Sequence, residues 1–218
     1  IRDRTMDNLF IDIGAKDKAD AEQYVQIGDF AVFEAPRFEQ NGVLCGPYLD
    51  NRIGCVTLLL AMEQLAEAET ENDLYFVFTS QEEVGLRGAG AAAFSVEPDI
   101  AIAVDVTDTG DLPERKTPMA VDMGKGPAVK VMDRSVICTP AVCAALEQAG
   151  ADCGVATQRE ILQFGGTDTA ALQKARAGVQ AGAISIPTRY IHSPSEMCAV
   201  SDVEGAAKLL AGFAVGQN

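Results

Sequence analysis

Apolar residues follow two different spacings along the chain, and the spacing changes near residue 49. Before this point, short stretches alternate apolar and polar positions and are broken by turn residues such as Gly28-Asp29 and Asn41-Gly42. This pattern predicts short β-strands. The expected strand-like segments are residues 9–15, 22–36 and 41–46.

After residue 49, strand-like apolar runs alternate with segments whose apolar residues recur at helical spacing. Pro140 and Gly150 are typical first and last residues of one such helix. Alternating strands and helices indicate an α/β domain with three layers (αβα) and a mostly parallel central sheet. The expected helices are 52–68, 88–94, 140–150, 167–177 and 203–215, and the expected strands are 74–79, 100–104, 128–132 and 182–186.

Composition narrows the classes of protein that fit. With 218 residues and 48% hydrophobic content, the chain can form one domain of good size, or one domain plus a fragment of another. A net charge of −15 argues against nucleic acid or an anionic membrane surface as a partner. No apolar run approaches the ~20 residues that span a bilayer. The six cysteines form no CxxC pair, which favours reduced thiols in a cytoplasmic protein.

Four acidic residues and the only histidine of the sequence are predicted to meet at one edge of the sheet. They are Asp50, Glu82, Glu83, Asp105 and His192. All but Asp50 end or follow predicted strands, where open α/β sheets bind ligands. Asp50 precedes the first long helix, whose dipole also favours an anion.

Each of these residues taken alone has an ordinary explanation. One adjacent Glu-Glu pair is expected by chance in this composition, Asp50 alone fits a helix cap, and a lone histidine is more often a surface or core residue. Asp105 is different, because an acid that closes an apolar strand needs a partner. Crowded carboxylates also raise one another's pKa, and divalent cations relieve that repulsion. Oxygen and imidazole ligands without thiolate suit Zn, Mn or Co, and a bridging carboxylate can hold two ions ~3.5–4 Å apart.

Six segments closely resemble the tetrahedral (TET-type) metallo-aminopeptidases, the family of glutamyl, leucyl and deblocking aminopeptidases with some members once labelled endoglucanases. In order, they are GPYLDNRIGC, FVFTSQEEVGLRGA, IAVDVTDTGD, GKGPAVKVMDRSVICTP, FGGTDTAALQ and GAISIPTRYIHSPSEM. The resemblance runs from about residue 7 to residue 210. It implies a zinc-peptidase (phosphorylase/hydrolase-like) fold and hydrolysis of N-terminal residues from short peptides, with two Zn, Co or Mn ions as cofactors. It also implies a homo-oligomer, with dimers as building blocks of a dodecamer.

The same resemblance assigns roles to individual residues. Asp50 would bridge two metal ions, Glu83 and His192 would complete one metal site, and Asp105 would belong to the other. Glu82 would be the general base, which typically contributes ~10²–10⁴-fold to the rate. Asp168 would lie near the site without being a ligand, and a helix cap is an equally good interpretation of it.

One feature departs from the family. Its members have a second ligand histidine in an N-terminal HxD-type segment, and this sequence has no second histidine. Residues 1–46 resemble the closing part of a β-rich lid and dimerisation domain, and residues 47–218 resemble a catalytic domain without its N-terminal portion. We therefore expect an N-terminally truncated chain that is weakly active or inactive, with the site of Glu83 and His192 better preserved.

Two other functions remain open from the sequence. An N-acyl amino acid deacylase could use the same metal ligands, and a catalytically inactive assembly subunit would explain the missing histidine. A glycosidase is disfavoured, because adjacent glutamates cannot easily flank one glycosidic bond.

Overall fold

The computed structural model describes Thr5, residues 8–113 and residues 118–216 of the 218-residue chain. The chain divides into two compact units, Ile1–Phe33 and Glu34–Asn218. This division falls after Phe33, whereas the sequence placed the boundary after residue 46. The assignment of residues 1–46 to a lid stays a prediction.

Among its described residues, the first unit has a short α-helix, α1 (Lys18–Ala21), whose first turn is capped by the side chain of Asp17. The strands expected at 9–15 and 22–36 are wrong, since the structure describes no strand there. Large apolar side chains in this unit are exposed, among them Phe10 at 86% and Phe30 at 99%. Alternating residues do not form a ladder here because no neighbouring strand pairs with them.

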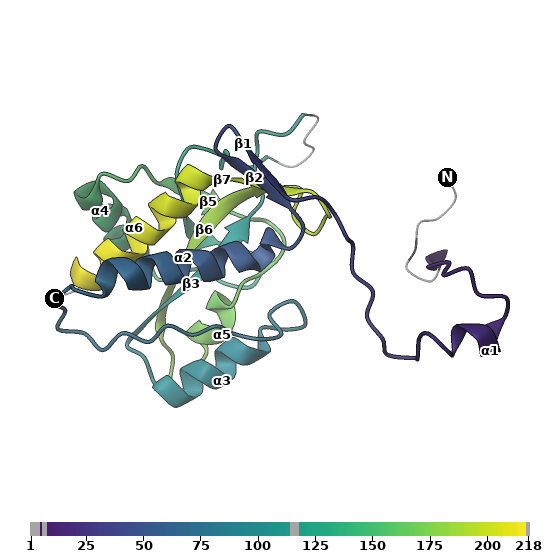
Figure 1. Ribbon diagram of the computed structural model, residues 1–218. Helices are drawn as coiled ribbons and strands as arrows, with labels where there is room; N and C mark the ends of the chain where they lie inside the picture. Colours follow the sequence, from purple (N-terminus) through teal and green to yellow (C-terminus); the bar gives the residue numbers. More distant parts are fainter. Residues whose placement is uncertain (1–4, 6–7, 114–117, 217–218) are drawn as a thin grey trace. The chain divides into compact units, whose positions relative to one another are not determined.

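The second unit is built on one mixed sheet, drawn in Figure 1. Its strands follow the order β1-β2-β7-β6-β4-β5, and β3 pairs with β6. The strands are β1 (Phe38–Gln40), β2 (Val43–Gly46), β3 (Ile100–Thr107), β4 (Ala128–Met132), β5 (Gln158–Ile161), β6 (Gln180–Arg189) and β7 (Glu196–Ala199).

The expectation of a mostly parallel sheet is wrong. Parallel pairing joins β3 to β6 and β4 to β5, whereas the other pairings of the described strands are antiparallel. For two of the antiparallel pairs, β1 with β2 and β6 with β7, the reason is the length of the connection. A turn joins β1 to β2 and a short loop joins β6 to β7, and neither is long enough for the crossover that parallel strands need. Only a longer connection, such as the helix between β4 and β5, allows parallel neighbours.

Helices cover both faces of this sheet, so the expected three-layer α/β/α architecture is confirmed (Figure 1). In Figure 1 the helices α2, α4 and α6 lie on one side, and α3 and α5 lie on the other. Their bounds are α2 (Leu49–Leu65), α3 (Arg87–Val96), α4 (Pro140–Cys153), α5 (Thr169–Gln173) and α6 (Val200–Gly216). Within the described part of the chain, no helix has both the length and the apolar character needed to cross a bilayer.

The main core lies between the sheet and the layer of α2, α4 and α6. Leu146, Ile184 and Leu209 are fully buried there. Gly182 of β6 lets α4 approach closely, because a Cβ at this position would lie 2.6 Å from Val142 Cγ1.

Residues 74–79 do not form the strand that their sequence predicts, and they belong to none of the described strands. Together with β3, α3 and the start of α2, they line a cavity of about 1080 Å³. Tyr75 and Phe78 remain 66% and 49% exposed. The alternating β-forming residues of this segment are typical of a strand, but the segment pairs with none of the described strands.

Candidate metal centre

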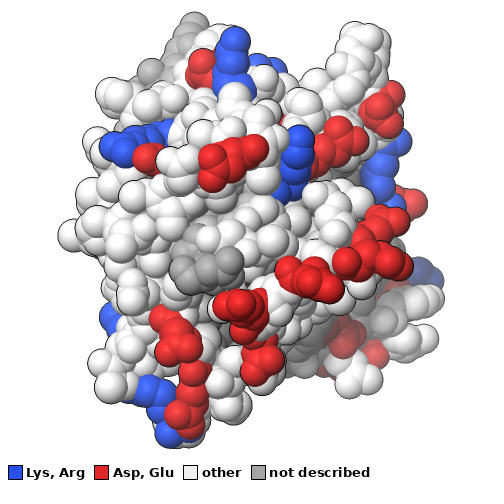
Figure 2. All heavy atoms as spheres, turned by 90° about the vertical axis from the view of Figure 1, so that its left-hand side faces the viewer, with Lys and Arg blue, Asp and Glu red and all other residues white. Residues whose placement is uncertain are grey.

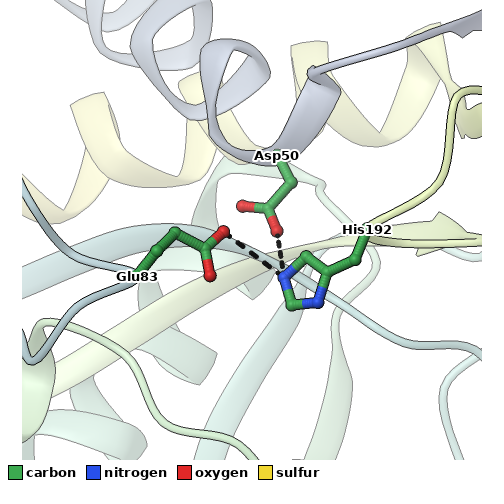
Figure 3. A group of neighbouring side chains, drawn as sticks. All are labelled: Asp50, Glu83 and His192. Carbon is green, nitrogen blue, oxygen red and sulfur yellow. Dashed lines mark ion pairs between the residues drawn. The ribbon is translucent and has the colours of Figure 1, made fainter. Parts of the chain in front are cut away.

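Three side chains that are distant in sequence converge at one point of the second unit (Figure 3). His192 Nε2 lies 3.0 Å from Asp50 Oδ2 and 3.3 Å from Glu83 Oε1. One donor atom from each of the three residues lies within 4.8 Å of the others. Two carboxylate oxygens and one imidazole nitrogen are ligands that Zn, Mn or Co accept.

Each of these residues is presented by an irregular piece of backbone. Asp50 lies in the first turn of α2, where its ψ of 112° departs from the helix. Glu83 lies in a tight turn in which the N–H groups of Gly85 and Leu86 donate to the carbonyl of Glu82. His192 follows β6 in a left-handed conformation with φ +62°. The left-handed conformation of His192 is uncommon outside glycine, and such conformations are enriched at ligand sites.

The carboxyl group of Asp50 lies in an environment that opposes its ionisation. Burial and then the charge of Glu83 raise its pKa to about 6, although His192 acts in the opposite direction. Burial also raises the pKa of Asp105 well above its usual value, and the charge of Asp50 adds to this effect. Asp105 is 7% exposed on β3. The ionised forms of these neighbouring acids are therefore unfavourable unless a cation lies beside them.

Glu82 lies outside the group of three donors, but the charges of Glu83 and Asp50 in that group add to the effect of burial in raising its pKa. Burial, followed by repulsion from Glu83 and Asp168, raises the pKa of Glu82 to about 7. Asp168 accepts a 2.6 Å hydrogen bond from the Thr79 hydroxyl through Oδ2, while its buried Oδ1 has no hydrogen-bond partner. Burial raises the pKa of Asp168 as well.

The structure places all the sequence-predicted site residues in one region. Glu82, Asp105 and Asp168 line the same cavity as Asp50 and Glu83. Only Asp50, Glu83 and His192 form a compact donor group among the described residues. Asp168 occupies the N-cap position of α5, as the helix-cap interpretation expects, but its side chain makes no capping hydrogen bond.

Glu196, which the sequence motifs do not single out, also belongs to the site. Its carboxylate accepts the N–H of Asp50 at 3.0 Å and the N–H of His192 at 2.8 Å. The available signal was an acid four residues after the only histidine, in HSPSE. Such a signal is too common to single out one residue.

These residues fit a bound metal by their donor chemistry. Asp50 and Glu83 both contact the imidazole of His192, burial raises the pKa of Asp50 and Asp105, and a divalent ion would supply positive charge beside these carboxylates. Figure 2 shows acidic side chains at many places on the visible face, with basic ones among them, so the acidity of the chain is not confined to one place.

The sequence as a whole matches a known protein family. A family model described as M42 glutamyl aminopeptidase matches residues 2–209. The chain belongs to this family. The resemblance to TET-type aminopeptidases that the sequence motifs indicated is thereby confirmed.

Several M42 relatives are similar over nearly the whole chain. A protein of Acetivibrio thermocellus, named provisionally as an aminopeptidase, is 49% identical over 205 residues, which cover 94% of this chain and 61% of the relative. The lysyl aminopeptidase of Pyrococcus furiosus is 35% identical over 207 residues, which cover 93% of this chain and 58% of that protein. The chain therefore spans about three fifths of the length of these relatives.

Solved structures show the same fold. An aminopeptidase from the archaeon Desulfurococcus kamchatkensis superposes with a TM-score of 0.89 at 35% identity, covering 95% of this chain and 59% of that chain. The Pyrococcus horikoshii TET1 peptidase is described as assembling into a tetrahedron or a large octahedral shell. It superposes with a TM-score of 0.83 at 33% identity, and the match covers 94% of this chain and 60% of that chain.

Proposed function

We propose that this chain supplies most of the active site of a metal-dependent aminopeptidase that removes N-terminal residues from short peptides. The observation that supports the proposal most strongly is the contact of His192 with Asp50 and Glu83, with a half-buried Glu82 beside them. Membership of the M42 family supports the class of reaction.

In this proposal, Asp50, Glu83 and His192 hold one divalent ion, and Asp50 and Asp105 hold a second one. Zn, Co and Mn are all compatible with these ligands. When bound, such ions polarise the scissile carbonyl and lower the pKa of water.

Glu82 acts as the general base. Its carboxylate takes a proton from the attacking water and later gives that proton to the leaving amine. A pKa of about 7 suits both steps, because general acid–base catalysis is most effective when the pKa lies near the working pH. Burial and the charge of Glu83 are the main causes of this raised pKa, and the charge of Asp168 adds to them.

A homo-oligomeric assembly and a cytoplasmic location are part of the same proposal. The assembly is supported by the shells described for the TET1 peptidase. The location is supported by the six cysteines, all of which are free thiols.

The proposal is tested by assaying the purified protein on a panel of aminoacyl-anilides with added Zn²⁺, Co²⁺ or Mn²⁺. Each substrate is compared with its N-acetylated counterpart. Weak cleavage of the free amines alone is the expected result, since the sequence has only one histidine, and it disappears with a chelator. Preferential hydrolysis of the N-acetyl group would indicate a deacylase instead. Metal binding without any hydrolysis would indicate an inactive assembly subunit.

A further inference from the structure

The carboxylate of Glu196 connects the backbones of two residues of the metal centre. Oε2 accepts the N–H of Asp50 at 3.0 Å, and Oε1 accepts the N–H of His192 at 2.8 Å. Glu196 is the first residue of β7 and is only 2% exposed. One rigid group therefore uses both of its oxygens to hold two segments that are far apart in sequence.

Glu196 is itself held in place by the sheet. Its backbone pairs with Gly46 of β2, which immediately precedes the loop into α2 and Asp50. On its other side, β7 pairs with the end of β6, from which the chain continues to His192. The carboxylate thus lies where the segments that carry the two ligands leave the same sheet.

The backbone conformations at Asp50 and His192 depend on hydrogen bonds such as those to Glu196. His192 has φ +62°, a conformation that non-glycine residues adopt only when surrounding contacts hold it. Asp50 lies at a break in the helical geometry of α2, so the helix does not fix its orientation. Hydrogen bonds from backbone N–H groups to a buried carboxylate are stronger than neutral ones.

We propose that Glu196 is a positioning residue that sets the separation of Asp50 and His192 and thereby determines metal affinity. This inference rests on the proposed metal site. Glu196 does not itself contact the donor atoms of the metal centre. Groups that orient ligands in this way typically contribute about 10–100-fold to metal affinity.

The test compares Glu196→Gln with the wild-type protein. Glutamine keeps the shape of the side chain, but its amide NH₂ would face one of the two N–H groups, so only one hydrogen bond remains. Glu196→Asp keeps the charge but shortens the reach. Glu204→Gln is the matched control, since Glu204 is exposed on α6.

Co²⁺ is the probe, with affinity measured by calorimetry and ligand geometry by the visible absorption of the bound ion. Glu196→Gln and Glu196→Asp are expected to bind Co²⁺ about 10–100-fold more weakly with a changed spectrum, and Glu204→Gln is expected to match wild type. Circular dichroism checks that each variant folds. Wild-type affinity and spectrum in a folded Glu196→Gln protein would overturn the inference, whatever happens to activity.

A second readout separates this inference from the proposed function. His192 is the only histidine of the 218-residue sequence, so its ring gives one set of NMR signals in the metal-free chain. These signals should shift in Glu196→Gln and stay unchanged in Glu204→Gln. If wild type binds no Co²⁺, the proposed function fails, but a shifted His192 ring would still support positioning. An unshifted ring would overturn it.

Discussion

Glu83 Oε1 lies 3.3 Å from His192 Nε2, whereas the adjacent Glu82 lies outside the compact donor group. Two neighbouring carboxylates therefore occupy different environments. Glu83 is available as a ligand, and Glu82 is half-buried with a pKa of about 7. This difference explains how one Glu-Glu pair can serve two roles.

Glu82→Gln should lower peptide turnover by about 10²–10⁴-fold and leave Co²⁺ affinity close to that of wild type, because glutamine cannot accept the proton. Glu83→Gln, in contrast, should weaken Co²⁺ binding, because Glu83 is a proposed ligand. Turnover of an aminoacyl-anilide and Co²⁺ calorimetry measure the two effects, with Glu63→Gln on the exposed side of α2 as control. Retained turnover in Glu82→Gln would remove it from the role of base.

Asp50→Asn should stabilise the metal-free protein at pH 7 while weakening metal binding. Burial and Glu83 raise the pKa of Asp50 to about 6 in spite of the contact with His192, so its ionised form is unfavourable in the metal-free fold. We expect the melting temperature to rise by about 2–4 °C in the presence of a chelator, as for a gain of about 1 kcal/mol. Calorimetry with and without Zn²⁺ measures this, and a lower melting temperature with chelator would contradict it.

The metal-free protein should lose stability as pH rises from about 4 to 7. Asp50 and Glu82 ionise near 3.8 and 4.5 in the unfolded chain but only at about 6 and about 7 in the folded one. The unfolded state therefore loses these protons first, so ionisation in this window favours unfolding. Urea titrations at a series of pH values should show a smaller decline for Glu82→Gln than for wild type. An equal decline would mean that Glu82 does not contribute.

Gly182→Ala should destabilise the core by about 1–3 kcal/mol, the usual cost of overpacking. The added methyl group would lie 2.6 Å from Val142 Cγ1 and force β6 and α4 apart. Urea denaturation measures the change in the free energy of unfolding. The control is Gly216→Ala, where an added Cβ meets no atom within 4 Å. Equal stability of both variants would show that α4 can move without cost.

Much of the second unit could be predicted from local pattern. The strand at 128–132 has the predicted bounds, and α2, α4 and α6 are found within a few residues of theirs. The apolar spacing and the end residues of these helices are local signals, and packing against the sheet stabilises the same elements. The shorter α5 falls inside the predicted range 167–177.

The features that the sequence predicted wrongly are those that depend on contacts between segments distant in sequence. Residues 74–79 have the sequence of a strand but pair with no described strand. The strands β5 and β7 were not predicted, because QREI and EMCA have no clear apolar alternation. The predicted direction of pairing was also wrong, since it follows from the path of the chain between the strands and not from strand composition. At the candidate site, the sequence indicated which residues meet, but not that Glu196 holds two of them.

The cavity between β3 and residues 74–79 has a practical consequence for anyone who handles this chain. Among the described strands, β3 pairs only with β6, so its other edge offers eight residues of backbone donors and acceptors. Next to it lies LYFVFT, an uncharged run of strong β-formers that is partly exposed. Free edges and such hexapeptides nucleate intermolecular cross-β aggregates. Concentrated solutions should therefore bind thioflavin T over time, and dilute storage should delay this.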